Sequence, residues 1–77
     1  MMTKLKEAFA NALSISTDQI TDDLKYRGIP EWDSISHMVL ISELEEEFDV
    51  EIETDDVIDM SSFQKAQEIL TKYGVKF

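Results

Sequence analysis

The sequence predicts a single all-α domain: a four-helix bundle with three longer helices, one short helix and a long first loop. Three stretches carry apolar residues at the three- and four-residue spacing of an amphipathic helix. Residues 50–53 alternate like a strand, but they lack a partner segment with which to form a sheet. A chain of 77 residues with 43% apolar content can bury one core but not two. We therefore expect one domain spanning residues 1–77.

The first helix is predicted over roughly residues 3–14. Thr3 is a suitable N-cap, because its side chain can accept a hydrogen bond from a free backbone N–H of the first turn. The opposite face of this helix is polar. The positions that recur at helical spacing predict the buried face: Leu5, Ala8, Phe9, Ala12 and Leu13.

Residues 14–33 are predicted to form a long loop that apolar side chains fix to the bundle. The segment is rich in Ser, Thr and Asp and includes a glycine and a proline. A connection of about twenty residues is unusual in a compact domain, so the segment is either a functional loop or one that contains a short extra helical turn near Thr17 or Thr21. The sequence does not decide between the two. We expect Trp32 to pack the loop onto the bundle; contact with a partner is the alternative. The anchoring side chains are spaced along the loop: Ile15, Ile20, Leu24, Tyr26 and Ile29.

The second helix is predicted to begin at Asp33 or Ser34 and to end near Phe48. Asp33 is a good N-cap, and neither glycine nor proline interrupts the residues that follow. On a helical wheel, one arc gathers side chains that would face the core: His37, Leu40, Ile41, Leu44 and Phe48.

A second apolar arc on the same helix has two explanations. Ile35, Met38 and Val39 gather, with Ser42, on the other side of the wheel. Either the long loop folds over this arc, or the arc is an exposed docking patch. Ser34 lies beside it at the helix N-terminus, where backbone N–H groups and the helix dipole would stabilise an attached anionic group. Taken alone, a serine at such a position is usually only a cap.

Two further helices follow an extended link. Thr54 can cap a short third helix that ends at Asp59 and begins with acidic residues, which the helix dipole favours. Its apolar contacts would come from Val57, Ile58 and Met60. Ser61 and Gln64 match a capping box for the fourth helix, and Gly74 offers its C-terminal stop. The buried face of that helix follows from the spacing of Phe63, Ala66, Ile69, Leu70 and Tyr73.

The charge balance limits the partners. Seventeen acidic residues against seven basic ones give a net charge of -10, which repels phosphate backbones and anionic lipid and attracts basic protein surfaces. We therefore expect neither nucleic acid nor membrane as a partner.

The absence of cysteine excludes a disulfide, a thiolate metal site and a cysteine nucleophile. With no secretory signal and no long apolar run, we expect a cytoplasmic protein. We also expect a monomer.

The residues around Ser34 resemble the acyl carrier protein family. Asp33, Ser34 and Ile35 form an Asp-Ser-Ile motif that enters a helix ending in the acidic residues 43–49, and the similarity extends over about residues 24–70. In that family a phosphopantetheinyl transferase attaches 4'-phosphopantetheine from coenzyme A to the motif serine, which Ser34 matches. The resemblance implies a protein that holds an acyl or aminoacyl group as a thioester on this arm and itself catalyses nothing. With Asp33 as the cap, the Ser34 hydroxyl is free for attachment.

The resemblance also implies a docking surface for the enzymes that load and process the cargo. It comprises two apolar residues beside Ser34, Ile35 and Met38, and an acidic pair that meets basic patches on those enzymes, Glu45 and Glu46. Ile52 and Val57 match the lining of the cleft near the arm. From the helical wheel, we add Val39 to the docking residues. Ser36 and Val39 stand where carriers of fatty-acid synthesis commonly have acids, and Trp32 replaces a small residue before the motif. These departures favour a specialised carrier, for polyketides, aminoacyl groups or polysaccharide decoration.

Other functions fit the sequence less well. A catalytic group of Ser34, His37 and Asp33 is disfavoured, because His37 lies toward the core. The acidic run over residues 43–56 lacks the spacing and central glycine of an EF-hand loop, so only diffuse cation binding is expected and no metal site. An unmodified acidic domain that binds a basic partner through the apolar patch is the alternative hypothesis. It predicts that Ser34→Ala leaves function intact.

Overall fold

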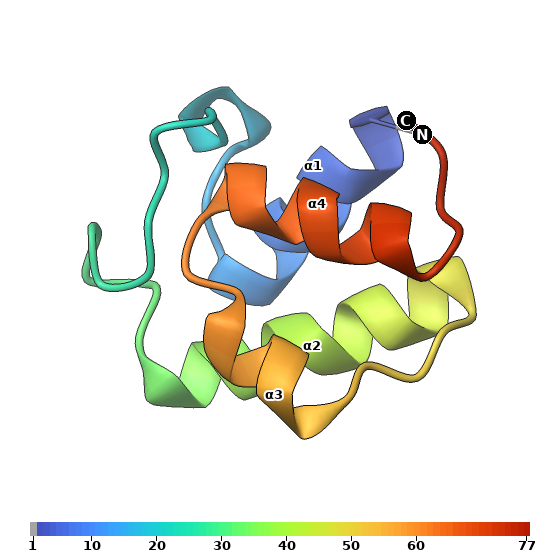
Figure 1. The fold of residues 1–77 in the computed structure, drawn as a ribbon. Helices are drawn as coiled ribbons and strands as arrows, with labels where there is room; N and C mark the ends of the chain where they lie inside the picture. Colours follow the sequence, from blue (N-terminus) through green and yellow to red (C-terminus); the bar gives the residue numbers. More distant parts are fainter. Residues whose placement is uncertain (1) are drawn as a thin grey trace.

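The computed structural model describes residues 2–77 as a bundle of helices joined by loops (Figure 1). Over these residues, the backbone pairing outside helices and turns is one isolated bridge between Lys25 and Ser62, which does not make a sheet. The predicted all-α fold, with three longer helices, one short helix and a long first loop, is confirmed. The elements in chain order are α1 Met2–Leu13, the 3-10 turn η1 Thr17–Gln19, α2 Ser34–Phe48, α3 Thr54–Asp59 and α4 Phe63–Lys72.

An aromatic cluster at the centre of the core joins three parts of the chain. The Phe9 ring of α1 packs edge-on against Phe63 of α4, with ring centroids 5.0 Å apart, and against Trp32 of the first loop at 5.5 Å. All three side chains are almost completely buried, so they supply much of the apolar area that stabilises this small fold. Trp32 therefore packs the loop onto the bundle, as predicted.

The long first loop is anchored by buried side chains and by backbone hydrogen bonds. Ile20 and Leu24 are buried in the core, and the extra helical turn forms at Thr17 as η1. Beyond it, the Tyr26 N–H donates to the Ser61 carbonyl and the Phe63 N–H donates to the Leu24 carbonyl, each at 2.9 Å. These two bonds tie the loop to the link between α3 and α4, so the loop presents a defined surface.

Two predicted helix starts are wrong by one residue, because contacts distant in sequence set them. Ser62, rather than Ser61, caps α4, and its Oγ accepts from the Lys65 N–H at 2.9 Å. The bridge to Lys25 holds Ser62 in the extended conformation that an N-cap needs. The Ser61 and Gln64 capping box is therefore absent.

The cap of α3 is likewise displaced, from Thr54 to Glu53. The Glu53 N–H donates to the Tyr73 hydroxyl at 2.9 Å, and this bond holds Glu53 extended ahead of the helix. The first helix also begins earlier than predicted: α1 includes Met2, which packs against the core, so Thr3 lies within the helix rather than capping it.

Three helices end in the same way. Ser14, Asp49 and Gly74 follow α1, α2 and the last turn of α4, and all three have a positive φ angle, at 57°, 54° and 95°. The residue after each of them donates its N–H to a carbonyl five residues earlier, at 3.1 to 3.2 Å. This satisfies carbonyl groups that a helix end would otherwise leave unpaired. The predicted stop at Gly74 is confirmed.

Candidate functional site

The start of α2 leaves the Ser34 hydroxyl exposed. Asp33 is the N-cap, and its Oδ1 accepts from the backbone N–H groups of Ile35 at 3.1 Å and Ser36 at 2.9 Å. The Ser36 Oγ in turn accepts from the Asp33 N–H at 2.9 Å, which completes a capping box. Ser34 is therefore the first helical residue. Over residues 2–77 its side chain makes no hydrogen bond, and the residue is exposed to solvent.

The cap also changes the electrostatics of this helix end. The N–H of Ser36 and then the Ser36 hydroxyl lower the pKa of the Asp33 carboxyl below its ordinary value, so the group is ionised at neutral pH. Of the N–H groups expected to stabilise an anion on Ser34, Asp33 occupies those of Ile35 and Ser36, whereas the N–H of Ser34 and the helix dipole can still favour a negative group there.

His37 lies behind Ser34 and faces inward, as predicted. The Trp32 Nε1–H donates to His37 Nδ1 at 3.0 Å, so the ring proton is on Nε2, which donates to the Val57 carbonyl at 2.8 Å. The Trp32 and His37 rings are also stacked, at a centroid distance of 6.0 Å. Both ring nitrogens are therefore engaged, and His37 cannot act as a base toward Ser34.

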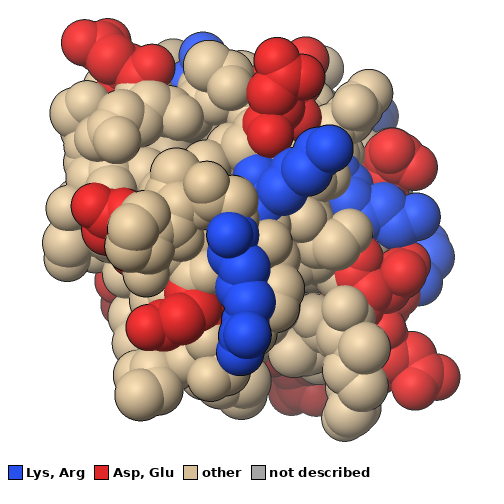
Figure 2. Space-filling model, turned by 90° about the vertical axis from the view of Figure 1, so that its left-hand side faces the viewer, with Lys and Arg blue, Asp and Glu red and all other residues tan. Residues whose placement is uncertain are grey.

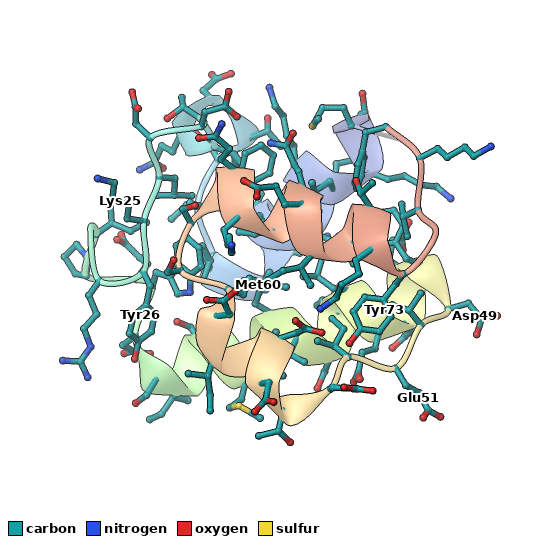
Figure 3. All side chains as sticks on the ribbon, in the orientation of Figure 1. Lys25, Tyr26, Asp49, Glu51, Met60 and Tyr73 are labelled. Atoms are coloured by element: carbon teal, nitrogen blue, oxygen red, sulfur yellow. The ribbon has the colours of Figure 1, made fainter. Side chains whose placement is uncertain are left out.

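A cavity of about 310 Å³ opens beside Ser34 between α2, α3 and the first loop. Tyr26 of the loop, labelled in Figure 3, and Met60 after α3 contribute to its wall. Most of its surface is apolar, and three of its lining residues, Tyr26, Ser34 and Ser61, carry hydroxyl groups. The full lining comprises Tyr26, Ser34, His37, Met38, Val57, Ile58, Met60 and Ser61.

The second apolar arc of α2 is uncovered. Ile35, Met38 and Val39 are 78%, 57% and 47% exposed, so the first loop does not fold over them. Ile58 of α3 is 76% exposed. It shares the lining of the cavity with Met38 and extends the apolar surface across that cavity. We call these four residues the apolar patch. Of the two explanations, the structure supports an exposed patch.

The other four predicted docking residues differ in how far they are exposed to solvent. Glu46 is exposed, whereas Glu45 is half-buried and its Oε2 accepts from the Ile52 N–H at 2.9 Å. Ile52 is only 8% exposed and belongs to the core, so it offers little surface to a partner and does not line the cavity. Val57 is half-buried and does line it.

The surface that carries the first loop is not uniformly acidic. Figure 2 shows lysine and arginine side chains lying among acidic ones on this face. Over residues 2–77, neither Lys25 nor Arg27 of the loop has a carboxylate within ion-pair distance. The Arg27 guanidinium lies 5.5 Å from the centre of the Tyr26 ring. The described chain also holds no cluster of three or more potential metal ligands and no helix suited to crossing a bilayer.

Sequence reasoning placed only three of the eight cavity residues at the site, Ser34, Met38 and Val57, and expected His37 in the core. Tyr26 was expected to be an anchor of the loop, and Ile58 and Met60 to be apolar contacts of α3; Ile58 instead points to solvent. Ser61 was expected to be a cap. The pairing of the loop with the link before α4 brings Tyr26 and Ser61 together, and the bond between His37 and the Val57 carbonyl holds α3 against α2.

The family is shown by comparison with known proteins. Residues 3–66 match the family model described as "Phosphopantetheine attachment site". The chain belongs to this family. It is similar to an acyl carrier protein of Chlorobium phaeobacteroides, at 32% identity over 69 residues, with 90% of this chain and 88% of that protein covered. It is also similar to an acyl carrier protein of Lactobacillus johnsonii, at 29% identity over 73 residues, with 95% and 91% covered.

This carrier protein bears a covalent 4'-phosphopantetheine arm and is not an enzyme. Proteins of its kind interact with phosphopantetheinyl transferases and with biosynthetic enzymes. The site fits such a group, because a hydroxyl without a partner stands at the edge of an open, largely apolar cavity. The arm supplies a terminal thiol on which an acyl group can be held as a thioester.

Proposed function

We propose that Ser34 is the attachment site of the arm and that the protein carries an acyl or aminoacyl group on it. The observation that supports this most is the exposed Ser34 hydroxyl at the first position of α2. Asp33 and Ser36 satisfy the helix end between them, so the Ser34 hydroxyl takes no part in capping. A transferase can therefore reach it without disrupting the helix.

The apolar patch and the exposed Glu46 are the proposed docking surface for partner enzymes. Ile35, Met38, Val39 and Ile58 would be buried against an apolar area of the partner, and Glu46 would meet its basic residues. Glu45 can contribute charge while it holds the link at Ile52. We leave Ile52 out of this surface because its side chain lies in the core, and we assign Val57 to the cavity wall.

A specialised pathway is the second part of the proposal. The first two turns of α2 after Asp33 carry no acid. Ser36 stands where carriers of fatty-acid synthesis commonly have an acid, and its hydroxyl is engaged in the capping box. Near Ser34 the docking surface is therefore apolar rather than acidic, which suits a dedicated set of partners more than a general one. We propose a monomeric cytoplasmic carrier serving a polyketide, aminoacyl or polysaccharide-related pathway.

The attachment site is tested by intact-mass measurement after incubation with coenzyme A, magnesium and a broad-specificity phosphopantetheinyl transferase. The wild type should gain the mass of one phosphopantetheine group, and Ser34→Ala should gain none. Ser42→Ala, which removes another exposed hydroxyl of α2, is the matched control and should be modified like the wild type. An unmodified wild type, or a modified Ser34→Ala protein, would refute the assignment.

The exposure of the apolar patch, taken alone, also suits the alternative hypothesis of an unmodified acidic domain that binds a basic partner through it, but the family match supports a modified carrier. The two proposals differ in what Ser34→Ala does in cells that depend on this protein. Loss of function in that strain supports the carrier. Full function of Ser34→Ala, together with loss of function in Met38→Asp, supports the interaction domain.

A further inference from the structure

The cavity beside Ser34 combines apolar side chains with a few hydroxyl-bearing ones. Met38, Val57 and Met60 supply apolar surface, whereas Tyr26 and Ser61 bring hydroxyl groups. Such a lining suits a ligand that has apolar parts and a few hydrogen-bonding groups. The group attached to Ser34 begins at the edge of this cavity, so its first atoms lie within reach of these side chains.

Tyr26 is held in place by contacts of its backbone and of its ring. Its N–H donates to the Ser61 carbonyl at 2.9 Å, and the next residue, Arg27, donates its N–H to the Trp32 carbonyl at 2.9 Å. The Tyr26 ring lies 5.3 Å from the His37 ring, in an edge-on geometry, and 5.5 Å from the Arg27 guanidinium. Its orientation is therefore set before any ligand arrives, which lowers the entropy cost of a contact.

The backbone of Arg27 supports the same conclusion. Arg27 has a φ angle of 63°, a left-handed conformation that non-glycine residues seldom adopt. Glycine or asparagine is the usual choice at such a turn position. Here an arginine occupies it, and its guanidinium lies against the Tyr26 ring. The bond from the Arg27 N–H to the Trp32 carbonyl holds this conformation, so the turn that follows Tyr26 is fixed.

The Tyr26 hydroxyl has no hydrogen-bond partner within residues 2–77, although the residue is half-buried. The other tyrosine behaves differently: the Tyr73 hydroxyl donates to Asp56 Oδ2 at 2.6 Å and accepts from the Glu53 N–H at 2.9 Å. A buried tyrosine hydroxyl usually has a partner within the protein, whereas that of the half-buried Tyr26 stays free to bind a ligand. The structure thus leaves one oriented donor unused beside Ser34.

We propose that Tyr26 is a positioning residue whose hydroxyl donates a hydrogen bond to a carbonyl oxygen of the arm and holds the arm's inner part in the cavity. This inference rests on the proposed attachment at Ser34. The arm carries two amide groups and a dimethyl-substituted carbon, which match the hydroxyl-bearing and the apolar side chains of the cavity. A cavity of about 310 Å³ is at the lower limit for ligand pockets. It therefore holds a segment of the arm and leaves the thioester end free for partner enzymes.

The experiment compares arm resonances in NMR spectra of the holo wild type and holo Tyr26→Phe, both loaded from coenzyme A with an isotope-labelled pantetheine. Intact mass first confirms loading. In the wild type we expect nuclear Overhauser contacts between the Tyr26 ring and the arm, and amide shifts distinct from those of free coenzyme A. In Tyr26→Phe the ratio of docked to undocked arm should fall about two- to tenfold, the factor that one net hydrogen bond supplies.

Two controls separate arm positioning from a change in the fold. Ser42→Ala removes an exposed hydroxyl that does not line the cavity, and its arm resonances should match those of the wild type. The unfolding midpoint of apo Tyr26→Phe should equal that of the apo wild type, because the ring and its packing are kept.

The outcomes also separate this inference from the attachment itself. If the wild type gains mass but its arm resonances match free coenzyme A, or are the same in Tyr26→Phe, the positioning role is wrong and the attachment stands. If the wild type gains no mass, the attachment at Ser34 is wrong and the positioning role falls with it.

Discussion

His37 connects three parts of the site through one side chain. It belongs to α2, accepts a hydrogen bond from Trp32 of the first loop, and donates one to the Val57 carbonyl of α3. The Val57 carbonyl lies in the last turn of a short helix, where carbonyl groups have no partner within the helix. His37, which was considered as a catalytic residue, therefore has a structural role: it links α2, α3 and the first loop next to Ser34.

Replacing this residue should destabilise the fold. His37→Phe keeps a ring of similar size but leaves the Trp32 N–H and the Val57 carbonyl without their partner. Each unpaired buried group costs about 1–3 kcal/mol, so we expect the free energy of unfolding to fall by about 2–6 kcal/mol. Urea denaturation measures the change. The exposed neighbour in Met38→Ala is the matched control and should shift the free energy by less than about 0.5 kcal/mol. An unchanged urea midpoint in His37→Phe would contradict the structural role.

At the scale of elements, α3 is held mainly by polar contacts. It has only six residues, and Ile58, one of its apolar side chains, points to solvent. The nearly buried Asp56 carboxylate contacts Lys72 Nζ at 2.6 Å and accepts from the Tyr73 hydroxyl at 2.6 Å. These contacts join α3 to the end of α4, and His37 joins it to α2. The position of α3, and with it one wall of the cavity, therefore depends on the negative charge of Asp56.

This dependence predicts acid sensitivity. Hydrogen bonds from Lys72, first, and from Tyr73 lower the pKa of Asp56 below its ordinary value of 3.8. A carboxyl whose pKa is lower in the folded state stabilises the fold above about pH 4, and this contribution is lost as the pH falls through the folded pKa. The lowered pKa of Asp33 acts in the same direction.

We therefore expect the stability of the wild type to fall more steeply below pH 4 than that of Asp56→Asn. Urea unfolding midpoints measured in steps from pH 6 to pH 2 test this expectation. The adjacent exposed Asp55 supplies the matched variant Asp55→Asn, which should follow the wild-type profile. Parallel profiles for the wild type and Asp56→Asn would show that the contacts with Lys72 and Tyr73 contribute nothing.

At the scale of the whole molecule, the net charge of -10 opposes a compact fold. The ion pairs found over residues 2–77 offset little of this repulsion: Lys4 with Glu47 and Lys65 with Asp59 are both largely exposed, at 3.8 and 3.5 Å. Lys72 with Asp56, at 2.6 Å, is the closest pair. Repulsion between acidic side chains is therefore spread over the surface.

Added salt should stabilise the protein at pH 7 by screening this repulsion. We expect a gain of about 1 kcal/mol between low and physiological ionic strength, which raises the melting temperature by about 4–8 °C in a domain of this size. Thermal unfolding in sodium chloride measures it. Magnesium chloride at equal ionic strength should act similarly, because the described residues offer no metal cluster. A much larger effect of magnesium would indicate a specific site.

The sequence by itself determined the helices and the chemistry at the start of α2. Apolar spacing placed the buried faces of α1 and α4, and Asp33 was recognisable as the cap that leaves Ser34 free. These features depend on residues within one or two helical turns of each other, so local pattern is sufficient. The inward position of His37 followed from the same wheel.

Only the tertiary structure decided which surfaces of those helices stay open. Contacts between segments decide that the loop leaves Met38 exposed and that Ile58 points to solvent. They also decide that Glu45 holds Ile52. The cavity beside Ser34 exists because the Tyr26 segment pairs with the Ser61 link, which lies far away in the sequence. Such pairings are chosen by the packing of the whole core, and no local pattern records them.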